Sequence, residues 1–326
     1  MKSSKSICFA AGKSGGHIIP CLTIAQQQYP DHEILFFSTD APLDMQIIGN
    51  QADHHITLPL GNLKYTKWYQ YPLIAWYLCS SFFKSLYYLA KHKPAKIIST
   101  GGIVAIPVCI AGFLLRIPIE LFELNVVPGK AIKALARLAT TIYVCFPDAQ
   151  TYLPSSIVRD YPIRFTHTQT TPQEVRLRIG LDPDKKTYFI LGGSQGSLFL
   201  NNLMRQFVEQ YADHVYQVIH QTGAQDATDW QTFYAQHNIL AQVFSYQQNL
   251  ADYYMAADVV ITRAGAGTLF ELLFFNKPHM VIPLETKTTV HQRNNAYALA
   301  AQYPKLCKVF EQNQVENNPE ILWQQL

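Results

Sequence analysis

The chain has 326 residues and a mass of 37.0 kDa, the length of about two domains. Hydrophobic residues make up 48% of it and charged residues only 15%, which excludes an intrinsically disordered protein. The six cysteines occur singly, which excludes a disulfide scaffold and gives no sign of a CxxC metal site. A net charge of +3 gives no reason to expect a nucleic-acid partner. No apolar run reaches the ~20 residues that span a bilayer, so we expect a cytoplasmic protein.

Charge is distributed unevenly along the chain. Between His54 and Ile119 there are seven basic residues and no acidic residue, whereas the remainder has 19 basic and 23 acidic residues. Ten aromatic residues fall between Tyr65 and Tyr88, with lysines on both sides. Trp and Tyr favour the headgroup level of a bilayer, and lysines are attracted to anionic lipid. The composition of residues 64–96 therefore predicts a surface that binds an anionic membrane. The alternative interpretation is a long helix that buries about half of these rings in the core.

Short apolar runs alternate with helical patterns in the first half of the chain. The runs are continuous rather than alternating, which is typical of parallel strands covered on both faces. The expected helices are His17–Tyr29 and Val104–Leu115. The expected strands are Ile7–Ala11, Glu33–Ser38, His55–Leu60, Ile97–Thr100, Ile117–Phe122 and Thr141–Phe146.

Residues 154–186 contain four prolines and many threonines, which indicates a linker. The pattern then restarts, and two such sets predict an α/β protein with two doubly wound, Rossmann-like domains, residues 1–162 and 163–326. Ligands bind at the carboxyl ends of such strands, so we expect the site in the cleft between the domains. The second set has expected strands at Tyr188–Leu191, Val215–His220, Val243–Tyr246, Val259–Thr262 and His279–Pro283, and helices at Ser197–Tyr211, Thr268–Phe275 and Gln292–Gln302.

Three expected strands end in glycine-rich turns, at residues 11–17, 192–196 and 263–268. Glycine allows close approach of the backbone to a ligand, and the helix that follows offers N–H groups to phosphate. The first turn is not a Walker loop, because Ile7 stands where that loop needs glycine. The second is not a dinucleotide fingerprint, because Leu191 stands where GxGxxG needs glycine. In the third, Arg263 could hold a diphosphate and Glu271 could accept both ribose hydroxyls, although Glu271 also suits a solvated helix surface.

With these loops, the chain resembles the MurG family, the glycosyltransferases of GT-B fold that build lipid II. The resemblance covers nearly the whole chain. It rests on Gly12–His17 (family GGTGGH), Gly101-Gly102, Glu123 and Asn125 (family HEQN), Pro162 and Arg164 (NPxR), Gly192–Gly196 (GGSQG), Arg263, Gly265, Thr268 and Glu271 (R-S/A-GAxTxxE), and His291, Gln292, Asn295 and Ala296 (HQxxNA).

The departures from the family pattern cluster on the acceptor side. Family sequences also continue, beyond the position of Leu326, with helices that return toward the N-terminal domain. This difference leaves two interpretations open, an altered coupling of the domains or a shortened gene. The substituted positions are Lys13 for glycine, Ile103 for tyrosine, Phe122 and Leu124 for histidine and glutamine, and Asp160-Tyr161 for Gly-Asn.

The resemblance implies inverting transfer of N-acetylglucosamine from UDP-GlcNAc to the muramyl 4-hydroxyl of lipid I, giving lipid II for peptidoglycan. It implies a peripheral enzyme on the inner face of the cell membrane. No DxD-like pair ends a strand, so we expect no metal and no cofactor. His17 is implied as the base, because imidazole titrates near neutrality, although a residue at the start of a helix can also do no more than contact phosphate. Asn125 is implied as the residue that orients the acceptor. The implied substrate-binding residues are Ser14, Gly15, Gly16, Glu123, Arg164, Gly193, Ser194, Gln195, Gly196, Arg263, Gly265, Thr268, Glu271, His291, Gln292 and Asn295.

Two other functions stay open at this point. Another GT-B enzyme of nucleotide sugars, such as a glycolipid synthase or a 2-epimerase, would keep the glycine loops, but an epimerase has no need of a membrane surface. A non-catalytic relic that binds nucleotide sugar or lipid would account for the altered acceptor-side residues. UDP release from UDP-GlcNAc, with and without a lipid I analogue, separates these functions.

Overall fold

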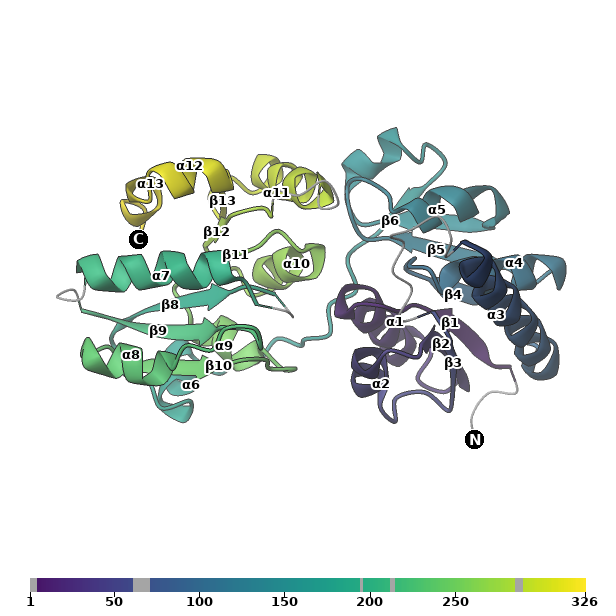
Figure 1. Cartoon of the computed structure of the whole chain (residues 1–326), viewed down its shortest axis with the longest axis horizontal. Coiled ribbons are helices and arrows are strands. Elements are labelled where there is room, and N and C mark those ends of the chain that lie inside the picture. Colours follow the sequence, from purple (N-terminus) through teal and green to yellow (C-terminus); the bar gives the residue numbers. More distant parts are fainter. Residues whose placement is uncertain (1–4, 61–70, 194–195, 212–214, 285–289) are drawn as a thin grey trace. The chain divides into compact units, whose positions relative to one another are not determined.

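The computed structural model describes residues 5–60, 71–193, 196–211, 215–284 and 290–326. The chain divides into two compact units, Met1–Arg164 and Phe165–Leu326. Each unit is a parallel sheet with helices on both faces, as Figure 1 shows. The prediction of two doubly wound α/β domains is therefore confirmed. Within the described residues, no helix combines the length and the apolarity that crossing a bilayer requires.

Unit 1 has a seven-stranded sheet in the order β3-β2-β1-β4-β5-β6-β7, with every pair parallel. All residues of β1 and β2 are buried, as their unbroken apolar sequence predicted. The strands are β1 (Ile7–Ala10), β2 (Ile34–Thr39), β3 (His54–Leu58), β4 (Ile97–Ser99), β5 (Ile119–Glu123), β6 (Thr141–Val144) and β7 (Ile157–Val158). The helices are α1 (Gly15–Gln28), α2 (Pro42–Ile48), α3 (Tyr71–His92), α4 (Ala105–Leu114) and α5 (Lys130–Leu135).

Unit 2 has a six-stranded parallel sheet in the order β10-β9-β8-β11-β12-β13. Alternate residues of β8 face opposite cores: Tyr188 and Ile190 join one cluster, and Phe189 and Leu191 the other. The strands are β8 (Lys186–Leu191), β9 (Tyr216–Gln221), β10 (Ala241–Phe244), β11 (Val259–Thr262), β12 (His279–Val281) and β13 (Cys307–Val309). The helices are α6 (Pro172–Arg178), α7 (Leu198–Tyr211), α8 (Trp230–Gln236), α9 (Ala251–Ala256), α10 (Ala266–Phe274), α11 (Val290–Gln302), α12 (Gln312–Asn317) and α13 (Glu320–Trp323).

The two sheets share one topological feature that positions the glycine turns. In unit 1, β1 lies between β2 and β4, and in unit 2, β8 lies between β9 and β11. The chain therefore reverses its direction of winding beside β1 and beside β8. In open parallel sheets, ligands bind outside the carboxyl ends of the strands at this switch point. The turns after β1 and β8 both lie there.

The predicted linker over residues 154–186 is wrong in its middle, because α6 occupies Pro172–Arg178. Thr171 caps this helix: its side chain accepts from the Glu174 N–H, and the Glu174 carboxylate accepts from the Thr171 N–H at 2.8 Å. Arg176 of α6 is buried, and it donates to Asp258 at 2.8 Å. The helix is thus part of the packed unit rather than a connector.

Candidate active site

The first glycine turn is held by a buried carboxylate that sequence analysis missed. Asp44, in α2, accepts from the Lys13 N–H at 2.8 Å and from the Thr39 N–H at 3.2 Å and hydroxyl at 2.6 Å. A Cβ at Gly12 would lie 2.8 Å from the same carboxylate, so only glycine fits there. Lys13 itself has φ of 72°, the left-handed region that favours the family's glycine. The hydrogen bonds to Asp44 hold this unfavourable conformation in place.

His17 has a fixed ring orientation at the end of this turn. Its Nδ1 lies 2.9 Å from the carbonyl oxygen of Thr100, and the Thr100 hydroxyl donates back to the His17 carbonyl at 2.9 Å. Because a carbonyl only accepts, Nδ1 carries the proton, and the lone pair of the neutral ring is on Nε2. A Cβ at Gly101 or Gly102 would lie within 4 Å of the imidazole. The turn after β4 thus makes room for the ring and sets its tautomer.

Ser14, Gly15 and Gly16 form the start of α1 next to His17. Ser14 is the N-cap, and its carbonyl accepts from the N–H groups of His17 and Ile18. The structure records no bond from the Ser14 side chain to the helix end within the described residues. Gly16 is exposed, so a ligand can approach the backbone here closely. The first turn of a helix of this length attracts anions through its N–H groups and its dipole.

Glu123 is the last residue of β5, and it is hydrogen-bonded to Asn125 in the loop that follows. The buried Glu123 carboxylate accepts from the Asn125 backbone and side chain at 2.8 and 3.1 Å, and from the Gly129 N–H at 2.8 Å. Burial raises the pKa of Glu123 even though these bonds act in the opposite direction. Both carboxylate oxygens therefore shape the loop that carries Asn125. Phe122 and Leu124, the two substituted neighbours, lie in the core.

Arg164 is the last residue of unit 1 and lies in the segment that follows β7. The Ile163 carbonyl accepts from Gln27, ten residues beyond His17 in α1. This spacing corresponds to about 15 Å along the helix axis. The structure therefore anchors the backbone before Arg164 to the far half of α1, away from the first glycine turn.

The second glycine turn, after β8, is closely packed. A Cβ at Gly192 would lie 2.4 Å from the Ser197 N, and a Cβ at Gly196 would lie 2.4 Å from Gly223. Gly193 and Gly196 have φ of 82° and 75°, and the Gly196 N–H donates to the Gly193 carbonyl at 3.0 Å. The turn leads directly into α7, a helix of 14 residues. Ser194 and Gln195 lie outside the described residues.

A buried polar network lies behind this turn and was not predicted. Asn201 of α7 donates to the Thr222 carbonyl at 2.9 Å and to Asp226 at 2.7 Å. Its carbonyl oxygen accepts from Nε2 of His220 at 3.1 Å, and Tyr234 donates to Nδ1 at 2.9 Å. Burial lowers the pKa of His220 to about 3, so the ring is neutral near pH 7. The network fixes the Thr222 carbonyl, which is one of the walls around Gly196.

Arg263 is buried at the end of β11, where its guanidinium binds protein groups. It donates to the Ser197 hydroxyl at 3.1 Å, to the Ile282 carbonyl at 3.1 Å and to the Gln312 side chain at 2.9 Å. It also stacks 4.8 Å from the Phe199 ring centroid. Arg263 thus joins the second glycine turn to the end of β12 and to α12. Its predicted contact with a diphosphate stays a prediction.

Glu271 is not the solvated helix residue that was the simpler interpretation of the sequence. It is buried in α10, and its Oε2 accepts from the Tyr254 hydroxyl at 2.8 Å. Gly265 is the N-cap of this helix and Thr268 lies in its first turn. The carboxylate is therefore oriented from behind by Tyr254.

The three remaining predicted residues share α11. Gln292 accepts from the Leu284 N–H at 3.1 Å, Asn295 is buried, and burial lowers the pKa of His291. Each unit thus brings its own group of predicted residues to the carboxyl edge of its sheet or to the helices that follow.

Comparison with known proteins agrees with this arrangement. The glycosyltransferase family 28 N-terminal domain matches residues 7–144, and the C-terminal domain of the same family matches residues 187–326. A relative from Protochlamydia amoebophila is 32% identical over 305 residues, which cover 90% of this chain and 80% of the relative. One from Bacillus subtilis is 28% identical over 307 residues, covering 90% and 83%. Both are named UDP-N-acetylglucosamine–N-acetylmuramyl-(pentapeptide) pyrophosphoryl-undecaprenol N-acetylglucosamine transferase.

The chain belongs to the MurG family of glycosyltransferases. Its fold is similar to the crystal structure of Acinetobacter baumannii MurG, with a TM-score of 0.72 at 24% identity over 98% of this chain and 89% of that one. A UDP-N-acetylglucosamine 2-epimerase has a TM-score of 0.57 at 12% identity over 94% and 88%. At such identities the likeness concerns the GT-B fold alone. The epimerase alternative therefore has support only at the level of the fold, whereas MurG-family membership rests on sequence similarity over 90% of the chain.

Proposed function

We propose that this MurG-family protein transfers N-acetylglucosamine from UDP-GlcNAc to the muramyl 4-hydroxyl of lipid I, with inversion, to form lipid II. The observation that carries the proposal is the orientation of His17, whose Nδ1–H is fixed by the Thr100 carbonyl. A neutral imidazole held in this tautomer presents Nε2 as a base at the switch point of unit 1. This is the group that a hydroxyl nucleophile needs.

The acceptor side is assigned to unit 1. As the hydroxyl attacks the anomeric carbon, Nε2 of His17 takes its proton, and the imidazolium is stabilised by the Thr100 carbonyl dipole behind it. Asn125, positioned by Glu123, orients the acceptor sugar. The start of α1 at Ser14–Gly16 attracts the lipid diphosphate.

The donor side is assigned to unit 2. The turn Gly192–Gly196 and the N-terminus of α7 offer backbone N–H groups to the UDP diphosphate, whose charge grows as the sugar leaves. Glu271, oriented by Tyr254, accepts the ribose hydroxyls, and Gln292 contacts the sugar. Backbone donors at the N-terminus of a helix need little rearrangement as charge develops on the leaving group, which is how such sites stabilise it.

The membrane surface is assigned to α3 and α4, which lie side by side in unit 1 (Figure 1). One face of α3 is exposed and apolar at Leu73, Trp76, Phe83 and Tyr87, with Trp76 69% and Phe83 65% exposed. The spacings of three, seven and four residues place these side chains on one stripe. Phe113 and Leu114 of α4 are also exposed. We name these six residues the α3–α4 apolar surface.

Other aromatic residues of the segment 64–96 are packed in the core rather than exposed, in line with the alternative interpretation that a long helix buries about half of these rings. Tyr77, Phe82 and Tyr88 pack against the core. Lys96 pairs with Glu120 at 2.6 Å, so its charge is partly neutralised. Residues 61–70, which include Lys64, Lys67 and Trp68, lie outside the described residues. We propose that the α3–α4 apolar surface and the exposed lysines of α3 hold the enzyme on the inner face of the cell membrane.

The decisive test of catalysis is UDP release from UDP-GlcNAc with a lipid I analogue. We expect His17→Ala to lower kcat by about 10²–10⁴-fold and to leave UDP affinity unchanged, because the base acts only in the chemical step. His237→Gln is the matched control, since His237 Nδ1 also bonds a backbone carbonyl, of Phe233 at 2.9 Å, within α8 and its C-cap. A wild type that binds UDP and never releases it from the sugar would favour the non-catalytic relic.

Membrane binding is tested separately by flotation with vesicles of anionic lipid. We expect the triple variant Trp76→Ser, Phe83→Ser and Phe113→Ser to lose most of its binding, because each side chain is exposed and apolar. The matched control carries the polar substitutions Leu198→Ser and Tyr303→Ser on exposed apolar residues of unit 2. Equal flotation of the triple variant and the wild type would refute this part of the proposal.

A further inference from the structure

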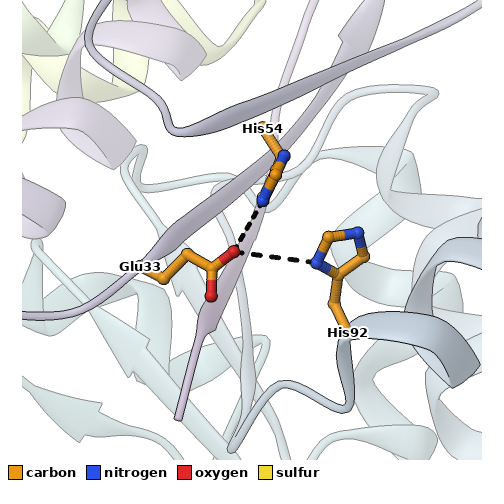
Figure 2. Close-up of side chains that lie close together, drawn as sticks. All are labelled: Glu33, His54 and His92. Atoms are coloured by element: carbon orange, nitrogen blue, oxygen red, sulfur yellow. Dashed lines mark hydrogen bonds and ion pairs between the residues drawn. The ribbon is translucent and has the colours of Figure 1, made fainter. Parts of the chain in front are cut away.

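A second cluster of chemically active side chains lies at the opposite edge of the unit 1 sheet. Glu33 precedes β2, His54 begins β3, and His92 is the last residue of α3. Because the strands are parallel, their starts lie at the far edge from the glycine turns. Figure 2 shows both imidazole rings directed at the Glu33 carboxylate from separate elements. The transferase residues described above include none of the three.

The three side chains converge closely on a small volume. His54 Nε2 is 2.6 Å from Glu33 Oε1, and His92 Nδ1 is 3.8 Å from the same oxygen. The centroids of the two rings are 4.5 Å apart, and one potential ligand atom from each residue lies within 4.8 Å of the others. The His54 and Glu33 side chains are 45% and 38% exposed and that of His92 is 12% exposed, so an ion would enter from the side of His54 and Glu33.

An ordinary ion pair accounts for only part of this geometry. Glu33 and His54 form a hydrogen-bonded pair, but His92 stops 3.8 Å away. The His92 ring is thus directed at a carboxylate that already has a partner, and its Nδ1 can serve as a ligand for a cation held between the three side chains.

The ligand set matches one class of ion. Imidazole nitrogen and carboxylate oxygen suit Zn²⁺ and neighbouring divalent metals, whereas Mg²⁺ and Ca²⁺ prefer oxygen alone. Tetrahedral Zn²⁺ with bonds of about 2.0–2.1 Å holds its ligand atoms about 3.4 Å apart. The separation of 3.8 Å is near this value, and the separation of 2.6 Å must widen as the ion replaces the shared proton.

We propose that Glu33, His54 and His92 bind Zn²⁺ with a water molecule as the fourth ligand. The ion would tie the last turn of α3 to the starts of β2 and β3. Its role is structural, because the site lies at the edge of the sheet opposite His17. Since α3 carries most of the α3–α4 apolar surface, the ion would steady the helix that we assign to the membrane.

The test uses protein without an affinity tag, from which EDTA has removed metal. Zn²⁺ binding is then measured by titration calorimetry, and its effect on Tm by thermal unfolding. We expect one equivalent of Zn²⁺ to bind and to raise Tm, and Mg²⁺ to do neither. His92→Gln, His54→Gln and Glu33→Gln should each weaken binding at least tenfold. His237→Gln, which removes one histidine elsewhere, should bind as the wild type does.

A spectroscopic arm separates this site from the other histidines and from misfolding. With Co²⁺ in place of Zn²⁺, the wild type and His237→Gln should show the visible absorption bands of a metal with a low coordination number. His92→Gln should not show these bands. Each variant should keep the wild-type rate of UDP release in detergent, which reports that it is folded. A wild type that binds no Zn²⁺, or a His54→Gln/His92→Gln variant that binds it equally well, would overturn the proposal.

Discussion

The two glycine turns occupy the same position in their sheets but are built differently. The turn after β1 is held by a buried carboxylate, Asp44, and it ends in an imidazole. The turn after β8 is held by close backbone packing around Gly192 and Gly196 and by the guanidinium of Arg263. The first suits a hydroxyl that must lose a proton, and the second suits a diphosphate that gains charge. The shared topology fixes only the location, and the loop residues decide the chemistry.

The largest effect is expected where the second turn is tightest. Gly196→Ala would place a Cβ 2.4 Å from the Gly223 Cα and 2.5 Å from the Thr222 carbonyl, at a φ of 75°. We expect unit 2 to lose about 3–5 kcal/mol of stability and UDP affinity to fall more than tenfold. Denaturant unfolding and UDP titration measure the two effects.

Gly193→Ala is the matched control for this prediction. Gly193 has a similar φ of 82°, but a Cβ there would meet nothing within 4 Å among the described residues. Only backbone strain remains, which costs about 1–2 kcal/mol. Equal losses in the two variants would show that conformation, rather than packing against the turn after β9, holds this loop.

Sequence patterns predicted the sheets well because buried parallel strands have continuous apolar sequences, as in β1 and β8. They missed α6 because four prolines dominated the stretch, although Thr171-Pro172-Gln173-Glu174 is a capping box with proline at its first helical position.

A site residue could be predicted only where it comes soon after a predicted strand. His17 and the glycines follow strands directly, so their place at the sheet edge could be inferred. Asp44 accepts a hydrogen bond from Lys13, and His220 donates one to Asn201. In both pairs the partner is distant in sequence, and no local pattern indicates such a contact. Arg263 was expected at its strand end, but its bonds to Ser197 and Gln312 depend on tertiary packing.

A smaller effect is expected from Asp44→Asn, which removes the carboxylate charge that holds the first glycine turn. Asp44→Asn keeps the size of the side chain, but its NH₂ group would face the N–H donors of Lys13 or Thr39. We expect a loss of about 2–3 kcal/mol of stability, because a buried charged acceptor is replaced by a mismatched neutral one. The kcat should fall while UDP affinity stays at the wild-type value, since the donor turn belongs to unit 2.

Asp31→Asn provides the control, because Asp31 is exposed just before β2. We expect no measurable change in unfolding or kcat for this variant. If Asp44→Asn weakened UDP binding as strongly as it lowered kcat, the assignment of acceptor and donor chemistry to different turns would be wrong.

The smallest effect concerns Lys13, where this chain departs from the glycine of the family motif. Its φ of 72° costs a residue with a Cβ about 1–2 kcal/mol, and glycine would relieve that strain while gaining some freedom in the unfolded chain. We expect Lys13→Gly to stabilise unit 1 by about 1 kcal/mol, measured by denaturant unfolding. Gln206→Gly, at an exposed position inside α7, should instead destabilise unit 2 by about 1 kcal/mol. If Lys13→Gly also raised the KM for the lipid acceptor without changing kcat, the lysine would be retained for its charge beside the lipid diphosphate, at the expense of stability.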